Sequence, residues 1–205
     1  NAIWSKAYDY VTVQNCTFNY IMPDEDKDEK EGVVALVSSL CSADLTSLTV
    51  SNNTFNNCCT NVWPNMGDNA WDWGACINVM SSHTGYTVKG VSITGNTLNN
   101  CDGYGIAIGG MSSTATLTGS VTNNTITNGF MPICSSGFSP AAGYSITGNT
   151  ITGAYAYGIE LEATSNGDII VKNNTITGSA IPPDTRSHLL PHSPEHSEQL
   201  SMYLS

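Results

Sequence analysis

The sequence predicts an all-β solenoid of about six stacked coils, and three observations lead to this fold class. One motif, apolar-x-apolar-x-(Asn/Gly)-Asn-Thr-apolar, recurs along the chain, and a second set of short alternating segments lies between its copies. The shortest step between copies is about 25 residues, which suits one coil of a parallel β-helix. Because units this short can bury their apolar faces only against one another, we expect the coils to stack.

The main repeat has six copies that align without gaps. They are "VTVQNCTFNYI" from residue 11, "LTVSNNTFNNC" from 48, "VSITGNTLNNC" from 91, "GSVTNNTITNG" from 119, "YSITGNTITGA" from 144 and "IIVKNNTITGS" from 169. Their shared threonine marks the register at Thr17, Thr54, Thr97, Thr125, Thr150 and Thr175. Only the fourth copy lacks the first apolar residue, and only the first replaces the asparagine before the threonine, with Cys16.

The second set of segments supplies another strand in each unit. Its members are "GVVALVSS" from residue 32, "GACINVMSS" from 74, "GIAIGGMSS" from 105 and "GIELEATS" from 158. Their apolar residues recur at a period near two, as in half-buried strands. With coils about 4.8 Å apart, six coils make a rod on the order of 30 Å long.

The stretch "YSITGNTITGAYAYGIELEATSNGDIIVKNNTITG" from residue 144 carries a family resemblance. It resembles the repeat of right-handed parallel β-helix proteins, the pectin-lyase-like superfold, and the likeness extends over roughly residues 3 to 180. The resemblance implies a right-handed single-stranded helix. It does not define an activity, because that fold carries lyases, hydrolases, epimerases, adhesins and phage tailspikes.

The chain divides into two parts by composition. Residues 1–181 hold the repeats, and their first residues already read as the middle of a structural unit, so we expect the N-terminal cap to be missing. Residues 182–205 contain no glycine or asparagine and three of the four histidines. We expect this tail to be a C-terminal cap of the solenoid or a non-native extension.

The charge balance narrows the classes of partner. Six Lys/Arg against seventeen Asp/Glu give a formal net charge of −11, which disfavours nucleic acid and anionic lipid. No apolar run reaches the roughly 18 to 20 residues of a membrane span. Low charge with abundant Asn, Thr and Gly suggests a secreted or cell-surface protein.

Cysteines and sequons have structural interpretations that follow from the repeat. The seven cysteines show no zinc-site spacing, and we expect Cys58 and Cys101, at one repeat position, to form a buried apolar stack, with a disulfide as the alternative. Four N-x-T sequons, at Asn15, Asn52, Asn123 and Asn173, also share one position. We interpret them as tight-turn residues in asparagine and threonine ladders, with glycosylation second.

Two insertions fall at the same corner of consecutive coils. The marker threonine precedes the glycine of the second strand by eight residues in the coils at 97 and 150, whereas the intervals 17–32 and 54–74 are longer. The first insertion, "IMPDEDKDEKEG", is either a solvated loop or a Ca²⁺ site with Asp24, Asp26 and Asp28 as ligands. No other cofactor is indicated.

The second insertion contains "WPNMGDNAWDWG". Aromatic rings beside carboxylates suit a polysaccharide or oligosaccharide, because flat apolar faces pack on pyranose C–H groups. The alternative is that the tryptophans cover their own loop. The predicted substrate-binding residues at this corner are Trp63, Trp71, Trp73, Tyr104, Tyr155 and Tyr157.

The candidate catalytic groups are carboxylates. "GIELE" places Glu160 and Glu162 on one face of a strand, about 6.6 Å apart, within the range that glycoside hydrolysis needs. An exposed pair that only aids solubility is the alternative. The other candidate acids are Asp68, Asp72 and Asp102.

These residues favour a glycoside hydrolase-like protein over two alternatives. A Ca²⁺-dependent polysaccharide lyase or epimerase would need a base, for which the repeats offer only Lys6, Lys89 and Lys172. No Asn-Thr-Asp or Gly-His-Gly of polygalacturonases and no Asp-Pro-His-Glu of alginate epimerases occurs. The third possibility is a non-catalytic adhesin, fibre or surface recognition module.

Overall fold

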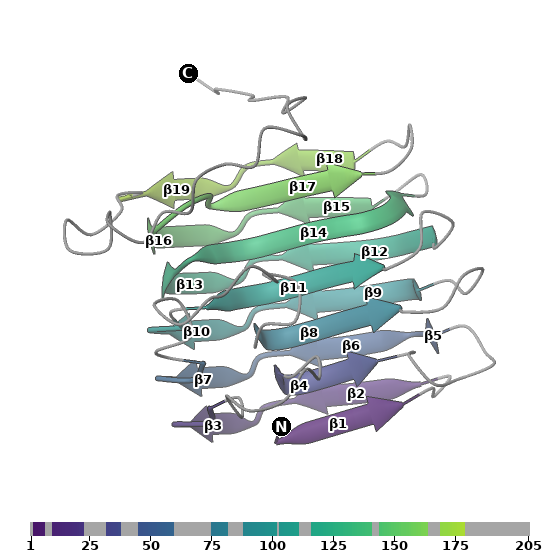
Figure 1. Cartoon of the computed structure of the whole chain (residues 1–205), viewed down its shortest axis with the longest axis horizontal. Coiled ribbons are helices and arrows are strands. Elements are labelled where there is room, and N and C mark those ends of the chain that lie inside the picture. Colours follow the sequence, from purple (N-terminus) through teal and green to yellow (C-terminus); the bar gives the residue numbers. More distant parts are fainter. Residues whose placement is uncertain are drawn as a thin grey trace, which may run out of the picture.

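The computed structural model describes residues 2–6, 10–22, 32–37, 45–59, 75–81, 88–101, 103–110, 116–140, 144–163 and 169–178. All regular secondary structure in these ranges is β, with no helix. The chain winds through three parallel sheets, here named A, B and C, and each coil adds one strand to each sheet (Figure 1). The 182–205 tail predicted from composition lies outside the described residues.

Each sheet is a stack of strands from successive coils. Sheet A contains β1 (Ile3–Lys6), β4 (Gly32–Val37), β8 (Ala75–Ser81), β11 (Tyr104–Gly110), β14 (Met131–Pro140) and β17 (Ile159–Ala163). Sheet B contains β2 (Val11–Gln14), β6 (Leu48–Ser51), β9 (Val88–Thr94), β12 (Thr116–Thr122), β15 (Tyr144–Thr147) and β18 (Ile169–Lys172), with the short β5 (Leu45–Thr46) beside β9. Sheet C contains β3 (Thr17–Asn19), β7 (Thr54–Asn56), β10 (Thr97–Asn99), β13 (Thr125–Gly129), β16 (Thr150–Ala154) and β19 (Thr175–Thr177).

The predicted repeat register is confirmed strand by strand in sheet C. The marker threonines pair in the order Thr17, Thr54, Thr97, Thr125, Thr150 and Thr175. The residue after each threonine points into the core from Phe18 to Ile151. Since all strand pairs are parallel and unshifted in this sheet, the gapless alignment of the sequence copies is also the spatial alignment of the coils.

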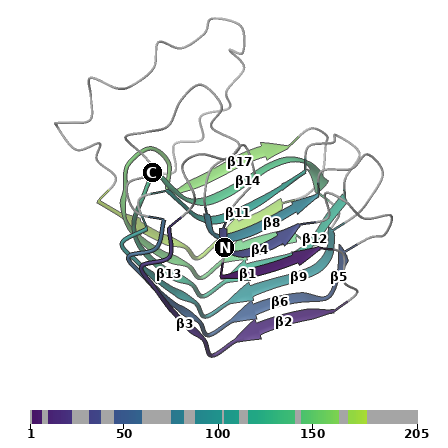
Figure 2. The ribbon, with the colours of Figure 1, turned by 60° about the horizontal axis from the view of Figure 1, so that its bottom comes forward.

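A sharp bend separates sheet B from sheet C in every coil (Figure 2). At its first residue the backbone has a positive φ, for example 57° at Asn15 and 54° at Asn52 and Asn123. Asparagine tolerates this left-handed conformation better than most residues. The sequon asparagines are therefore turn residues, as predicted, and Gly95 and Gly148 occupy the same position in the remaining coils.

The buried ladder is formed by the next residue of each turn. Asn53, Asn96, Asn124 and Asn149 are at most 1% exposed. In each, the backbone N–H and the side-chain Nδ2 both donate to the Oδ1 of the asparagine one coil further on, at 2.9–3.0 Å, and the column ends at Asn174. These asparagines, rather than the sequon residues, satisfy the polar groups that the bend would otherwise bury unpaired.

Gly119 explains why the fourth repeat copy lacks its first apolar residue. It has a φ of 129° and lies where β12 shifts register against β9. A Cβ at this position would lie 2.0 Å from the carbonyl oxygen of Val91. Any side chain is therefore excluded by the backbone of the neighbouring coil.

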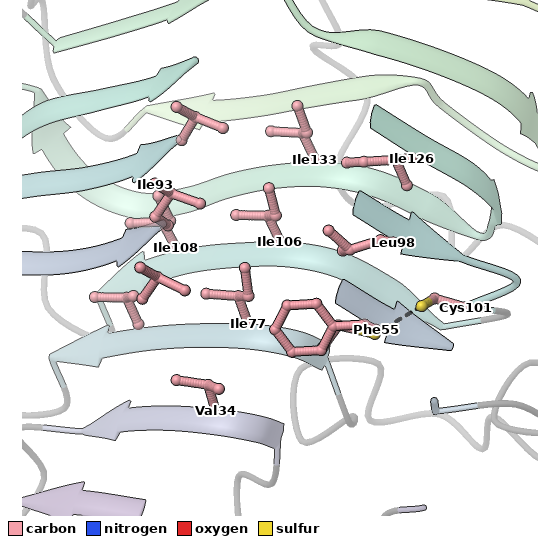
Figure 3. Packing of buried hydrophobic residues seen from close by; sticks show 14 of the residues in the cluster. Val34, Phe55, Ile77, Ile93, Leu98, Cys101, Ile106, Ile108, Ile126 and Ile133 are labelled. Carbon is pink, nitrogen blue, oxygen red and sulfur yellow. Dashed lines mark hydrogen bonds between the residues drawn. The ribbon is translucent and has the colours of Figure 1, made fainter. Parts of the chain in front are cut away.

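The three sheets enclose a continuous apolar core. Ile77, Ile106 and Ile133 stack along sheet A and face Ile93 and Leu98 from the other two sheets (Figure 3). Phe18 and Phe55 stack at a centroid distance of 4.9 Å. The expected burial of cysteine is confirmed, because Cys58 and Cys101 are both 0% exposed, and both are reduced thiols in this structure.

One hydrogen bond crosses this core. The hydroxyl of Tyr144 on β15 lies 2.8 Å from the hydroxyl of Ser135 on β14, and both side chains are buried. Burial raises the pKa of Tyr144, while the bond to Ser135 partly opposes that shift and the nearby Cys134 adds to it. The pair therefore joins sheets A and B through a neutral phenol.

Replacing Tyr144 with phenylalanine should lower the free energy of unfolding by about 1–2 kcal/mol, because the Ser135 hydroxyl loses this partner. The measurement is urea denaturation of the wild type and the variant. The double variant Tyr144→Phe/Ser135→Ala is the control, and it should be less destabilised than the sum of the two single variants. Additive effects would show that the two hydroxyls do not interact.

Candidate functional site

The two insertions leave and rejoin the helix at one corner. Residues 20–31 join β3 to β4 and residues 57–74 join β7 to β8. Because β3 pairs with β7 and β4 pairs with β8, both insertions start and end side by side between sheets C and A. In the later coils the same corner is short, at residues 100–103 and 155–158.

Many of the predicted site residues, on the two insertions and at the short corner of the third coil, lie outside the described residues. These are Asp24, Asp26, Asp28, Trp63, Asp68, Trp71, Asp72, Trp73 and Asp102. Glu162 is described only as a position in β17, opposite Ser136. The residues whose surroundings the structure defines are Tyr104, Tyr155, Tyr157 and Glu160.

Glu160 belongs to a row of residues that crosses sheet A. The register pairs Asn78 with Ala107, Ala107 with Cys134, and Cys134 with Glu160. The residues before these, Ile77, Ile106 and Ile133, are completely buried in the core. Since successive strand residues point to opposite faces, the row lies on the outer face of the sheet.

The Glu160 carboxylate is held against a thiol. It is half-buried, and its Oε2 accepts a hydrogen bond of 3.3 Å from the Sγ of Cys134. Cys134 is itself only 4% exposed. A fixed, half-buried carboxyl group is better suited to general acid or base chemistry than a mobile surface glutamate, because its position relative to a bound substrate is defined.

An apolar cluster lies beside this row at the C–A corner. Its buried members are Ala75, Tyr104, Phe130, Met131 and Cys134, with Ala107, Tyr155 and Ala156 packed against them. The buried members come from three successive coils, in which Tyr104 pairs with both Ala75 and Met131. Cys134, the hydrogen-bond donor to Glu160, therefore connects this carboxylate to the cluster.

The three tyrosines predicted to bind substrate at this corner differ in exposure. Tyr104 is only 5% exposed, because its ring packs edge-on against Phe130 at a centroid distance of 6.1 Å. Tyr155 is half-buried against the same cluster. Tyr157 is 45% exposed, so its ring remains open to a ligand.

Alternation continued from an extended Trp71–Trp73 segment into "GACINV" would make one face of that segment the inward one. Strict alternation does not hold there, because the consecutive residues Cys76 and Ile77 are both 0% exposed in the main core. Gly32 also pairs with Ala75 rather than Gly74, so the glycine alignment of the second repeat family is one residue out of register there. Alternation therefore does not determine which way the tryptophans face.

The sequence interpretation missed the contribution of the fourth coil. Strand β14 supplies Met131 and Cys134, and Phe130 precedes it. Its segment "FMPICSS" was not assigned to the second repeat family because Pro132 and the absence of an opening Gly-apolar pattern obscure it. The usable signal was position, since one strand is required between Thr125 and the next sheet B strand at Tyr144.

The described residues contain neither a metal-binding group nor a membrane-spanning helix. Among them, no group of three or more His, Cys, Asp or Glu is arranged to hold a metal ion. None of them forms a helix long and apolar enough to cross a membrane. The proposed Ca²⁺ ligands in residues 24–28 lie outside this part of the chain.

Comparison with known proteins agrees with the geometry. Residues 85–183 match the family described as a right handed beta helix region. Together with the stacked parallel sheets on both sides of residue 85, this match shows the parallel β-helix fold that the repeat predicts. No curated protein and no solved structure matches the chain.

Proposed function

We propose that this protein binds a polysaccharide on the outer face of sheet A beside the C–A corner and hydrolyses glycosidic bonds there with carboxyl groups. The observation that carries the proposal is the position of Glu160, half-buried on that face and hydrogen-bonded to Cys134. It lies on the sheet that both long insertions enter, in the same coil as the exposed Tyr157.

Sugar binding is supported by the nature of this surface. The open ring of Tyr157 precedes Glu160 by three residues, and Tyr155 adds a partly accessible ring at the same corner. Aromatic faces with a few fixed polar groups are typical of small-molecule and sugar sites. The tryptophans of residues 57–74 belong to an insertion that enters the same corner.

The chemistry requires two carboxyl groups, one of them protonated. Glu160 is one, and position 162 lies two residues further along β17, about 6.6 Å away by strand rise. That spacing along the strand is near the lower end of the separations between carboxyl groups that hydrolysis with inversion uses. Asp68, Asp72 and Asp102 are the other candidates for the second role.

The charge of the chain supports a neutral or weakly acidic polysaccharide. A net charge of −11 opposes the approach of a polyuronate unless a cation bridges the two. The low content of charged residues with abundant Asn, Thr and Gly favours a protein that is secreted or at the cell surface, where such polymers occur. We therefore place its action there.

The lyase or epimerase alternative has less support on this face. Two of its three candidate bases, Lys89 and Lys172, belong to strands β9 and β18 of sheet B. They are separated from Glu160 by the core, because sheets A and B enclose it from different sides (Figure 2). Of the three candidate bases in the repeats, only Lys6, at the end of β1, belongs to the same sheet as Glu160.

The test is a panel of neutral and acidic glycans, assayed with and without Ca²⁺ for new reducing ends and for unsaturated products. We expect new reducing ends without unsaturated products on at least one neutral glycan. Unsaturated products that depend on Ca²⁺ would favour the lyase. Binding without turnover across the panel would contradict hydrolysis and favour a recognition module.

A further inference from the structure

Four cysteines converge inside the C–A corner of two adjacent coils. Cys58 and Cys59 follow β7, Cys76 lies in β8 of the same coil, and Cys101 follows β10 in the next. All four are at most 1% exposed and belong to the main core. The hydrolysis proposal uses none of them.

Within this cluster Cys101 is in direct contact with Cys76, which also contacts Cys59. The Sγ atoms of Cys76 and Cys101 are 2.8 Å apart, and Figure 3 marks this contact with a dashed line from Cys101. Cys58, which shares the repeat position of Cys101, instead directs its Sγ to the carbonyl oxygens of Phe18 and Asn56. The geometry therefore favours Cys76, rather than the repeat-related Cys58, as the partner of Cys101.

Metal binding does not explain this grouping. Among the described residues, no three cysteines are arranged as ligands for one ion. The pair is also surrounded by apolar residues such as Phe55. A disulfide needs only two cysteines, and Cys76 and Cys101 are already in contact.

We propose that Cys76 and Cys101 form a disulfide that cross-links the second and third coils at the C–A corner. With a small-molecule disulfide such as oxidised glutathione as the oxidant, one thiolate attacks the glutathione disulfide and releases one glutathione. The second thiolate then attacks the mixed disulfide and releases another. Two protons and two electrons leave the protein, one S–S bond forms, and two molecules of reduced glutathione are produced.

The burial of the pair determines when this reaction occurs. Desolvation raises the pKa of Cys76 well above its usual value, and its contacts with Cys101 and Cys59 add to the shift. Because the thiolate is the reactive form, the folded, reduced protein should react slowly with oxidants. The bond should form while the coils assemble, when both thiols still meet solvent.

The experiment is to refold the full 205-residue chain in a mixture of reduced and oxidised glutathione. The remaining thiols are then alkylated without reduction, and a tryptic digest is analysed by mass spectrometry. Lys89 is the only tryptic site between residues 76 and 101, so the bond joins two peptides that otherwise separate. Fragmentation should assign the bond to Cys76 and Cys101, and reduction should raise the number of alkylated cysteines by two.

Matched variants separate this bond from its alternatives. Cys76→Ser and Cys101→Ser should each abolish the cross-linked peptide, whereas Cys58→Ser and Cys16→Ser should retain it. The oxidised wild type should unfold about 5–10 °C above its reduced form. A bond between Cys58 and Cys101, one between Cys59 and Cys76, or no cross-link at all after oxidative refolding would overturn the proposal, and each of these results is read from the wild type alone.

Discussion

Replacing Asn124 with alanine is expected to lower the free energy of unfolding by about 3–5 kcal/mol. The Asn124 Oδ1 accepts from the backbone N–H and Nδ2 of Asn96, and its Nδ2 donates to Asn149 and to the carbonyl oxygen of Ile93. The substitution removes these bonds in the interior, where water cannot replace them. It leaves donors of Asn96 and acceptors of Asn149 and Ile93 without these partners, which costs more than an exposed hydrogen bond.

Chemical denaturation followed by circular dichroism measures this effect. Asn99→Ala is the matched control, because Asn99 lies half-buried on the outer face of sheet C and its amide makes a similar 2.9 Å bond to Asn56. We expect the control to cost less than about 1 kcal/mol. Equal effects of the two substitutions would mean that the buried column contributes no more than a surface ladder.

Replacing Glu160 with glutamine is expected to reduce the rate of glycan hydrolysis by about 10²–10⁴-fold, on the substrate identified by the panel. Glutamine keeps the shape and can still accept the hydrogen bond from Cys134, but it cannot exchange a proton in the reaction. The fold should therefore persist while turnover is lost. Glycan affinity should change much less than the rate, because the substitution leaves the rings of Tyr155 and Tyr157 unaltered.

Initial rates of reducing-end release, with affinity measured separately by calorimetry, test this expectation. Lys172→Gln is the control, since it changes an exposed charge on sheet B and should leave the rate within about twofold. Loss of turnover in both variants would point to a general electrostatic effect. Wild-type activity in Glu160→Gln would remove Glu160 from the mechanism and direct attention to Asp68, Asp72, Asp102 and Glu162.

The sequence predicted the stacking of the coils correctly because every copy of the repeat carries the same turn and the same buried position. Each Asn-Thr turn fixes a bend, and the apolar residue after the threonine must enter the core, so aligning the copies also aligns the strands. The same reasoning placed both insertions at one corner. It erred where the chain departs from alternation, as at Cys76 and Ile77, and where a strand lacks its motif, as in β14.

The sequence predicted where the candidate site lies, but not which side chains contact one another there. The sequence located Glu160, Tyr155 and Tyr157 at the insertion corner, but it could not show that Phe130 covers Tyr104. It also gave no reason to pair Glu160 with Cys134, 26 residues away. These contacts join neighbouring coils on the outer face, where no shared motif marks the partners.

By itself, then, the sequence determined the number of coils, their register and the corner that carries the insertions, because periodic burial repeats in every coil. Only the tertiary structure decided which side chains meet across coils. It brought Cys76 onto Cys101, closed the core around Tyr144 and Ser135, and set the Glu160 carboxylate against a thiol. The physical reason is that strand spacing fixes which backbones are neighbours, whereas packing of unlike side chains fixes which atoms touch.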